Sequence, residues 1–392
     1  MSVTAPVGFV AGGVACGVKA SGDLDLALVA STDGRPVAAA AVFTANKAAA
    51  APVQVSRRHL EASDGRAAAV VVNSGNANAA TGAAGVAHAE QTCAVVAQGL
   101  GCRETEVLVC STGLIGIPLA IDRITAGIPV LLQARNSEGG PTAATAMMTT
   151  DTHAKQVVVP GAGFTVGGMA KGAAMLAPNM ATMLAVLTTD AATDPATLKR
   201  ALAEAVARSF NQMTVDGCTS TNDTVIVLAS GRAAPPAAPG EAELTDALWE
   251  ACADLAGQMA ADAEGGTRVV RVRVTGAASS ADAAAGARKI AQSPLVKCSF
   301  YGQDPYWGRV VSELGSAGIE FDLDRVEISY GGITVCRGGV AAGDPGRSAD
   351  LKKVMAADTV EVVARLGLGD GEAAMITCDL GHGYIDENMG TS

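Results

Sequence analysis

The pattern of hydrophobic and polar positions along the chain alternates between strand-like and helix-like stretches. Short apolar runs bounded by Gly, Asn, Asp and Ser predict strands at residues 26–30, 38–43, 68–72, 106–110 and 183–187. Apolar positions at helical spacing predict helices at residues 85–99, 195–209 and 281–292, the last with Ser280 as its N-cap. Several strands lead through a small-residue loop into a helix, and this order predicts a mixed α/β fold.

The middle and the C-terminal part of the chain continue this mixture. We expect a helix at residues 141–152, strands at residues 156–159 and 164–166, and a loop over residues 167–181. An alternating strand is expected at residues 268–275, and further strands at residues 327–330, 335–337 and 374–377. The Ala- and Pro-rich residues 232–240 predict a surface connection and a candidate domain edge. Residues 243–262 predict an amphipathic helix with one apolar face, made of Leu244, Leu248, Cys252, Leu255 and Met259.

Composition narrows the class of protein. Of 392 residues, 49% are hydrophobic and 3% aromatic, so the core must be built largely from Ala, Val, Leu and Ile. The net charge is −11 without a basic stripe, which argues against nucleic-acid binding. No apolar stretch approaches the ~18 residues of a membrane helix, and the first residues lack a signal-peptide pattern. We therefore expect a cytoplasmic protein without a membrane span.

The nine cysteines and four histidines do not predict a metal centre. The cysteines are dispersed without a C-x-x-C pair, and the histidines are isolated from one another and from the cysteines. Such a distribution indicates reduced thiols that pack as small hydrophobic side chains.

Residues 169–184 hold the densest collection of candidate chemistry. A glycine-containing approach with Lys171 leads to a Pro-Asn turn, then to Ala181 and Thr182, and then to an apolar run. A strained turn here would present the Ala181 carbonyl to the Thr182 hydroxyl, whose attack gives an ester that water opens. The freed amine, with a reference pKa of roughly 7.7–8.0, would then serve as base for its own hydroxyl. On spacing alone, an ordinary loop that enters a core strand explains the segment equally well.

Seven further motifs, spread over nearly the whole chain, favour the first interpretation. They are FTANK (43–47), VNSGNAN (72–78), STG (111–113), MMTTDT (147–152), VDGCTSTNDT (215–224), DPYWGR (304–309) and YIDEN (384–388). Together with residues 169–184, this set resembles the glutamate N-acetyltransferases of arginine biosynthesis, also called ornithine acetyltransferases.

The resemblance implies a fold, a processing event and an assembly. The fold is a layered helix–sheet–sheet–helix α/β sandwich related to the self-processing aminopeptidases. Cleavage between Ala181 and Thr182 gives an α chain of residues 1–181 and a β chain of residues 182–392. Two α and two β chains form a heterotetramer.

The resemblance also assigns roles to individual residues. Thr182 is the nucleophile, and the Thr112 hydroxyl and the Gly113 N–H form the oxyanion hole. Such donors are already in place and stabilise the carbonyl oxygen as it gains negative charge. The amino-acid substrate is bound by a set that spans the chain: Thr149, Lys171, Thr182, Glu264, Asn388 and Ser392.

These residue types suit an amino-acid substrate. Lys171 can pair with a carboxylate and Glu264 with an amine. The chain departs from the family at its C-terminal tail, which is one residue short, so Thr391 is an alternative to Ser392. It also departs at Cys218, where an acidic residue is common; we expect a structural role for this cysteine.

The reaction implied is a double displacement. Thr182 takes acetyl from N-acetylornithine, and glutamate then accepts it, with no metal or cofactor because the ester and the oxyanion hole carry the chemistry. A self-processing amidase or aminopeptidase, with water as acceptor, is the second hypothesis; a binding protein that has lost activity is the third. The sequence does not decide whether acetyl-CoA is also a donor, and we favour the form that only recycles acetyl.

Overall fold

The computed structural model describes residues 2–176, 183–343 and 348–390. It divides into two compact units, the first made of Met1–Asn211 and Cys218–Met259 and the second of Gln212–Gly217 and Ala260–Thr391. The candidate domain edge at residues 232–240 is therefore wrong, because this segment lies inside the first unit. Backbone hydrogen bonds hold it there: Ala192 N–H donates to Ala237 O (2.8 Å) and Ala233 N–H to Asp190 O (2.9 Å).

The first unit contains two sheets. Sheet A has the order β1-β2-β5-β6, with β1 Phe9–Val14, β2 Leu26–Ser31, β5 Ala69–Asn76 and β6 Val107–Leu114. Sheet B has the order β4-β3-β10-β9-β8-β7, with β4 Arg66–Ala67, β3 Val37–Phe43, β10 Thr224–Ala229, β9 Leu184–Thr189, β8 Thr165–Lys171 and β7 Lys155–Pro160. The pairs β5·β6 and β9·β10 are parallel, and the other neighbouring pairs are antiparallel.

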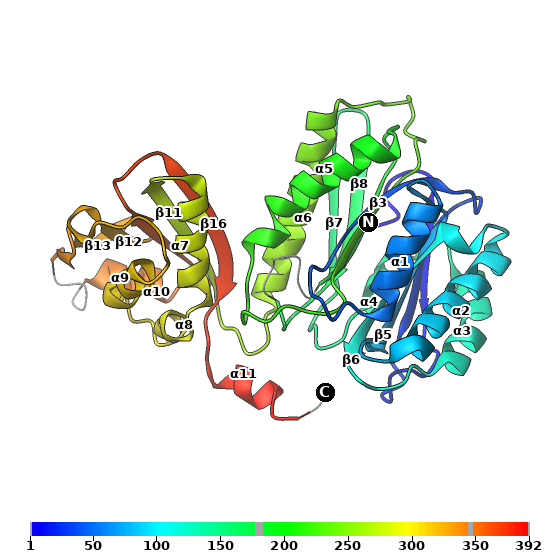
Figure 1. The fold of residues 1–392 in the computed structure, drawn as a ribbon, viewed down its shortest axis with the longest axis horizontal. Helices are drawn as coiled ribbons and strands as arrows, with labels where there is room; N and C mark the ends of the chain where they lie inside the picture. The colour runs from blue at the N-terminus through cyan, green and yellow to red at the C-terminus, as the bar shows by residue number, and fades with distance from the viewer. Residues whose placement is uncertain (1, 177–182, 344–347, 391–392) are drawn as a thin grey trace. The chain divides into compact units, whose positions relative to one another are not determined.

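Helices cover both outer faces of this pair of sheets (Figure 1). The first unit has the helices α1 Ala51–Ala62, α2 Gly82–Leu100, α3 Ile121–Ala134, α4 Gly140–Ala146, α5 Pro195–Ala207 and α6 Glu241–Ala261. One hydrophobic core joins sheet A to α1, α2 and α3, whereas α5 packs on β3 and α6 is hydrogen-bonded to β7. A second core lies between the sheets and includes α4. The predicted mixed α/β class, with its helix–sheet–sheet–helix layers, is confirmed in this unit.

The buried strands explain why short apolar runs were a strong signal. Every residue of β2, β9 and β10 is buried, as expected for strands covered on both faces. On α6 the five apolar-face residues predicted from helical spacing are fully buried. Small side chains dominate the inter-sheet core, in keeping with the Ala- and Val-rich composition.

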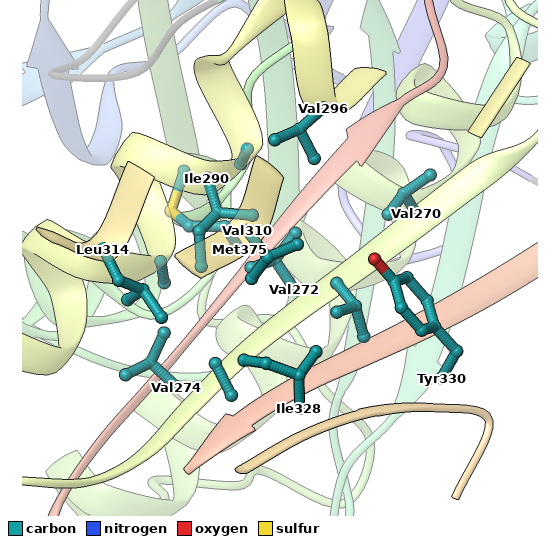
Figure 2. Close-up of a cluster of buried hydrophobic side chains, with 14 of the residues drawn as sticks. Val270, Val272, Val274, Ile290, Val296, Val310, Leu314, Ile328, Tyr330 and Met375 are labelled. Carbon is teal, nitrogen blue, oxygen red and sulfur yellow. The ribbon is translucent and has the colours of Figure 1, made fainter. Parts of the chain in front are cut away.

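The second unit is built on one sheet with helices on one face. Sheet C has the order β14-β13-β12-β15-β11-β16, with β14 Val340–Ala341, β13 Ile333–Arg337, β12 Glu327–Tyr330, β15 Thr359–Arg365, β11 Val269–Ala277 and β16 Gly371–Cys378. Its helices are α7 Ser280–Gln292, α8 Pro294–Tyr301, α9 Trp307–Gly315, α10 Ala349–Met355 and α11 His382–Glu387. Figure 2 shows the core that α7, α8 and α9 form with the sheet.

Three local predictions differ from the structure. The helix expected at residues 141–152 ends at Ala146, because Asp151 accepts the Thr149 N–H and diverts the backbone. The loop expected from residue 167 begins only after β8, which continues to Lys171 by pairing with β7 and β9. The N-cap of α7 is Ser279 rather than Ser280, since the Ser279 side chain accepts the Asp282 N–H.

The core of the second unit gives a stability prediction. Ile290 on α7 is fully buried against sheet C, as Figure 2 shows. Its replacement by alanine should lower the free energy of unfolding by about 2–5 kcal/mol, because it removes buried methyl groups and leaves a cavity. Urea unfolding measures the change. Val340→Ala, at a position 65% exposed, is the matched control and should change stability by less than ~0.5 kcal/mol. Equal effects of the two would contradict this packing.

Candidate active site

The predicted oxyanion pair lies at the end of β6. There the parallel pairing of β5 and β6 is irregular, with a register shift at Gly75 and Asn76. Gly113 has φ +129°, and a Cβ on it would lie 2.3 Å from the Gly75 carbonyl carbon. Only glycine fits so close an approach. In the sequence Ser-Thr-Gly, Thr112 is therefore the last buried residue of β6, with 9% of its surface exposed.

Asparagine side chains fix the peptide that precedes Thr112. Asn222 Nδ2 donates to Ser111 O (2.9 Å) and to Ala77 O (2.6 Å). The Ser111 hydroxyl donates to Asn73 Oδ1 (2.6 Å). These are buried bonds, so the backbone beside the oxyanion pair is held without solvent.

Lys171 ends β8 in sheet B and reaches across to sheet A. It stands opposite Leu184 in the register of β8 and β9, and its Nζ lies 3.2 Å from Thr112 Oγ1. Because an ammonium can only donate, the Thr112 oxygen accepts from it and the Thr112 hydroxyl proton must point elsewhere. That orientation leaves the hydroxyl as a donor for an oxygen that gains negative charge.

A buried carboxylate organises this corner. Asp151 Oδ1 accepts from Lys155 Nζ and from Gly172 N–H, both at 2.7 Å. Its Oδ2 accepts the Thr149 N–H at 3.0 Å and lies 3.9 Å from Lys171 Nζ. Asp151 therefore brings together Thr149 and Lys171, two of the predicted substrate-binding residues.

The charges around Asp151 determine its ionisation. Burial alone would raise the pKa of this carboxyl, but the positive charges of Lys171 and Lys155, with the hydrogen bonds from Lys155 and Gly172, lower it to about 2. The site thus holds a carboxylate between two lysines at neutral pH. The ammonium of Lys171 stands at Thr112, where it can interact with an anionic group.

A second buried carboxylate contacts the residue that follows the predicted nucleophile. Asp223 Oδ1 accepts the Met183 N–H at 2.7 Å. Burial raises the pKa of Asp223 well above its usual value, and the Met183 hydrogen bond and the Lys171 charge oppose this only in part. Asp223, Thr112, Lys171 and Met183 line one small cavity.

Two predicted substrate-binding residues lie together in the second unit. Asn388 Nδ2 donates to Glu264 Oε2 at 2.8 Å, and it also donates to Tyr384 O. Tyr384 in turn directs its hydroxyl to Asp216 Oδ2 (3.4 Å). Glu264 is 8% exposed and Asn388 is exposed.

The predicted site residues thus fall into two groups, one in each unit. Thr112, Gly113, Thr149 and Lys171 gather in the first, and Glu264 and Asn388 in the second. The remaining predicted residues lie outside the described part of the chain: Ala181, Thr182, Thr391 and Ser392.

Sequence reasoning missed Asp151, Lys155, Asn222 and Asp223. Asp151, Asn222 and Asp223 belong to motifs that were recognised, MMTTDT and VDGCTSTNDT, but no role was attached to them. The available signal was charge, because Asp151 is the one charged residue of MMTTDT, and Asp223 and Asp216 are the two of VDGCTSTNDT.

The expectation for the cysteines is only partly met. Cys218 and Cys298 are exposed, so they do not pack as small hydrophobic side chains: Cys218 lies in a loop and Cys298 on the outward side of α8. Within residues 2–176, 183–343 and 348–390, no cluster of His, Cys, Asp or Glu is arranged to hold a metal ion. In the same residues no helix has the length and apolarity required to cross a membrane.

Known proteins resemble this chain over its full length. Residues 10–390 match the ArgJ family. The arginine biosynthesis bifunctional protein ArgJ of Mycobacterium tuberculosis strain H37Rv is 49% identical and covers 100% of this chain and 96% of its own. The protein of the same name from Thermobifida fusca is 45% identical, with 100% of both chains covered.

Two solved structures are similar to part of this chain. An ornithine acetyltransferase complexed with ornithine, from Mycobacterium tuberculosis, is 45% identical over 46% of this chain and 95% of its own, with a TM-score of 0.42. An ArgJ protein from Bacillus halodurans is 36% identical over 52% of this chain and 96% of its own, with a TM-score of 0.49.

The class is an acyltransferase, as the site motifs predicted. The chain belongs to the ArgJ family of arginine biosynthesis, which confirms the predicted resemblance.

Gly113→Ala should damage the site through one contact. The new Cβ would collide with the Gly75 backbone, so β5 and β6 must separate and the Thr112 hydroxyl must move. We expect the acyl-transfer rate to fall by a factor on the order of 10² or more, as for loss of one oxyanion donor. Gly116→Ala is the matched control: Gly116 also has positive φ (+81°), but nothing lies within 4 Å of its Cβ position. A similar rate loss in both variants would assign the effect to backbone strain alone.

Asp151→Asn should change stability in a pH-dependent way. The Asp151 pKa is lowered to about 2 in the folded protein, so its stabilisation is fully present above the unfolded value near 3.8 and is lost as the pH falls toward 2. At neutral pH the variant removes the negative charge that lies between two buried lysines and should lose about 3–5 kcal/mol. Urea unfolding at several pH values tests this. A stability gap that stays constant from pH 7 to pH 3 and below would contradict the assigned ionisation.

Proposed function

We propose that this protein is a self-processed glutamate N-acetyltransferase that moves acetyl from N2-acetyl-L-ornithine to L-glutamate in cyclic L-arginine biosynthesis. Thr182, freed by cleavage after Ala181, is the nucleophile and carries the acetyl group as an ester. The family supports the acetyltransferase class, and the relatives' printed names support the pathway.

One observation carries the proposal further than the family does. The Lys171 ammonium, the Thr112 hydroxyl and Met183 line the same cavity. Met183 directly follows Thr182 in the chain, which supports the proposal that Thr182 reacts next to Thr112 and Lys171. An ester-forming reaction needs this combination of nucleophile and oxyanion donor.

The chemistry proceeds in two symmetrical halves. In the first, the Thr182 oxygen attacks the acetyl carbonyl of N-acetylornithine, the α-amine of Thr182 accepts the hydroxyl proton, and ornithine leaves with a proton on its nitrogen. In the second, the glutamate amine attacks the ester and returns the oxygen to Thr182. In both halves Thr112 Oγ and Gly113 N–H donate to the carbonyl oxygen as it gains charge.

The charged residues suit amino-acid substrates. In the first unit Lys171 supplies the cation for a substrate carboxylate, and Asp151 holds it in place beside Thr149. In the second unit Glu264 supplies the carboxylate for a substrate amine, with Asn388 bonded to it. The C-terminal hydroxyl of Ser392, or that of Thr391, completes the set.

Processing and assembly follow from the same proposal. The α chain of residues 1–181 and the β chain of residues 182–392 stay together and pair into a heterotetramer of two copies of each. The enzyme acts in the cytoplasm. Neither metal nor cofactor takes part in the reaction.

Thr182→Ala should abolish both processing and transfer. On a denaturing gel, wild type should give two fragments, the second of which begins at Thr182. The variant should give a single full-length band, because no hydroxyl remains to attack the Ala181 carbonyl. Thr182→Ser keeps a hydroxyl and is the matched control, which should still cleave. An active wild-type preparation that remains uncut would contradict the proposal.

The acceptor separates this function from its alternative. Initial rates measured at several concentrations of both substrates should give parallel lines in a double-reciprocal plot. The reason is that acetyl is transferred to the enzyme and ornithine leaves before glutamate binds. Intersecting lines would contradict an acetyl-enzyme. Free acetate in place of N-acetylglutamate would indicate the amidase. The relatives' name "bifunctional" makes acetyl-CoA the next donor to assay.

A further inference from the structure

Asp223 has an oxygen that the site described so far does not use. The side chain is 2% exposed and follows Asn222 in the segment that leads into β10. Oδ1 is occupied by the Met183 N–H. Oδ2 is buried and has no hydrogen-bond partner among the described residues, although the Ser220 and Thr44 hydroxyls lie near enough to favour the charged form. A buried carboxylate oxygen without a partner is costly and calls for a ligand.

The cavity next to Asp223 has the size of one small ligand. It offers about 10 Å³ to the centre of a water-sized sphere. That is close to the least space that holds a single water molecule, which also requires two to four polar partners. The polar lining comprises Thr112, Lys171, Ser220, Asn222 and Asp223. The cavity is too small to hold an amino-acid substrate.

We propose that this cavity binds one water molecule against Asp223 Oδ2, and that Asp223 is the general base by which this water opens the ester during self-cleavage. The inference rests on the proposed self-processing at Thr182. It adds a catalytic residue and a reactant site to the processing step and leaves the acetyl-transfer steps unchanged.

The step is balanced as follows. After the Thr182 oxygen has attacked the Ala181 carbonyl and the peptide bond has rearranged to an ester, the bound water attacks that carbonyl carbon. Asp223 takes one proton from the water as the new C–O bond forms. The bond between the carbonyl carbon and Thr182 Oγ then breaks, and Oγ takes the proton from Asp223. The products are the Ala181 carboxyl group and a Thr182 with a free amine and a free hydroxyl.

The surroundings fit this role for three reasons. The Met183 N–H holds the Asp223 carboxylate on the backbone of the residue that follows Thr182 in the chain. Thr112 lines the same cavity and can donate to the carbonyl oxygen that the attack makes negative. Burial raises the Asp223 pKa well above its usual value, and a carboxylate whose pKa is raised is a stronger base.

Asp223→Asn tests the proposal because the amide keeps the shape and can still accept the Met183 N–H, but it cannot take a proton. Newly made precursor should cleave at least ~100-fold more slowly than wild type. Hydroxylamine opens esters without help from a base. It should therefore cleave the folded Asp223→Asn precursor and leave a hydroxamate on Ala181 and a free Thr182.

The matched control is Asp190→Asn at the opposite end of β9. Asp190 is 5% exposed and likewise accepts a backbone N–H at 2.7 Å, from Thr165, and its variant should cleave like wild type. Thr182→Ala should remain whole in hydroxylamine because it forms no ester. Thermal melting establishes that each variant is folded. If Asp223→Asn does not fold, Asp223→Ala with added formate replaces it, and formate should restore cleavage.

Two results would overturn the proposal. Normal cleavage of Asp223→Asn would reduce Asp223 to a structural contact with Met183. A folded Asp223→Asn precursor that resists hydroxylamine would place the defect before the ester. In both cases cleaved wild type and intact Thr182→Ala would leave the proposed acetyltransferase standing, whereas an uncut wild type would refute the self-cleavage itself.

Discussion

The site depends above all on one buried carboxylate, Asp151, held between Lys155 and Lys171. Removing an aspartate and a lysine from water is costly unless they are paired and their remaining groups are bonded. Here Asp151 also accepts the Thr149 and Gly172 N–H groups, so both its oxygens are used. The fixed carboxylate lies 3.9 Å from Lys171 Nζ, which donates to the Thr112 hydroxyl oxygen. A hydroxyl that accepts from an ammonium has its own proton left for the reacting oxygen.

This arrangement also joins the two sheets of the first unit. Lys171 belongs to sheet B and Thr112 to sheet A, so their hydrogen bond connects the two sheets. It lies next to the first residue of β9. The segment before β10 makes a second connection. Asn222 holds the Ser111 carbonyl in sheet A, and the adjacent Asp223 holds the Met183 N–H in sheet B. Two successive side chains, Asn222 and Asp223, thereby fix the end of β6 relative to the residue before β9.

Local sequence signals predicted much of the fold, and they failed where distant contacts decide. The buried strands β2 and β9 are short apolar runs and were predicted. The buried strand β10 is also a short apolar run but was not predicted. β1 was missed because Gly12 and Gly13 interrupt its apolar pattern; a Cβ on Gly13 would lie 2.5 Å from Thr142 O in α4, a constraint no local window reveals. The helix α1 begins without a side-chain cap, so Pro52 in its first turn was its one start signal, and that signal was not used.

The same contrast holds for the site. Thr112, Gly113, Lys171 and Thr149 could be named because they lie in motifs that resemble a known family, and the structure brings them together in the first unit. Asp151 and Asp223 could not be assigned from motifs, because their roles consist of contacts: with Lys155 and Gly172 for the first, and with a backbone N–H on a strand 40 residues away for the second.

The most direct test of the account is the intact mass of the two processed chains after mixing with N-acetylornithine in the absence of glutamate. The account predicts one added acetyl group on the chain that begins with Thr182, none on the chain of residues 1–181, and loss of the adduct when glutamate is added. An unmodified chain in an active preparation, or an acetyl group that glutamate does not remove, would contradict it.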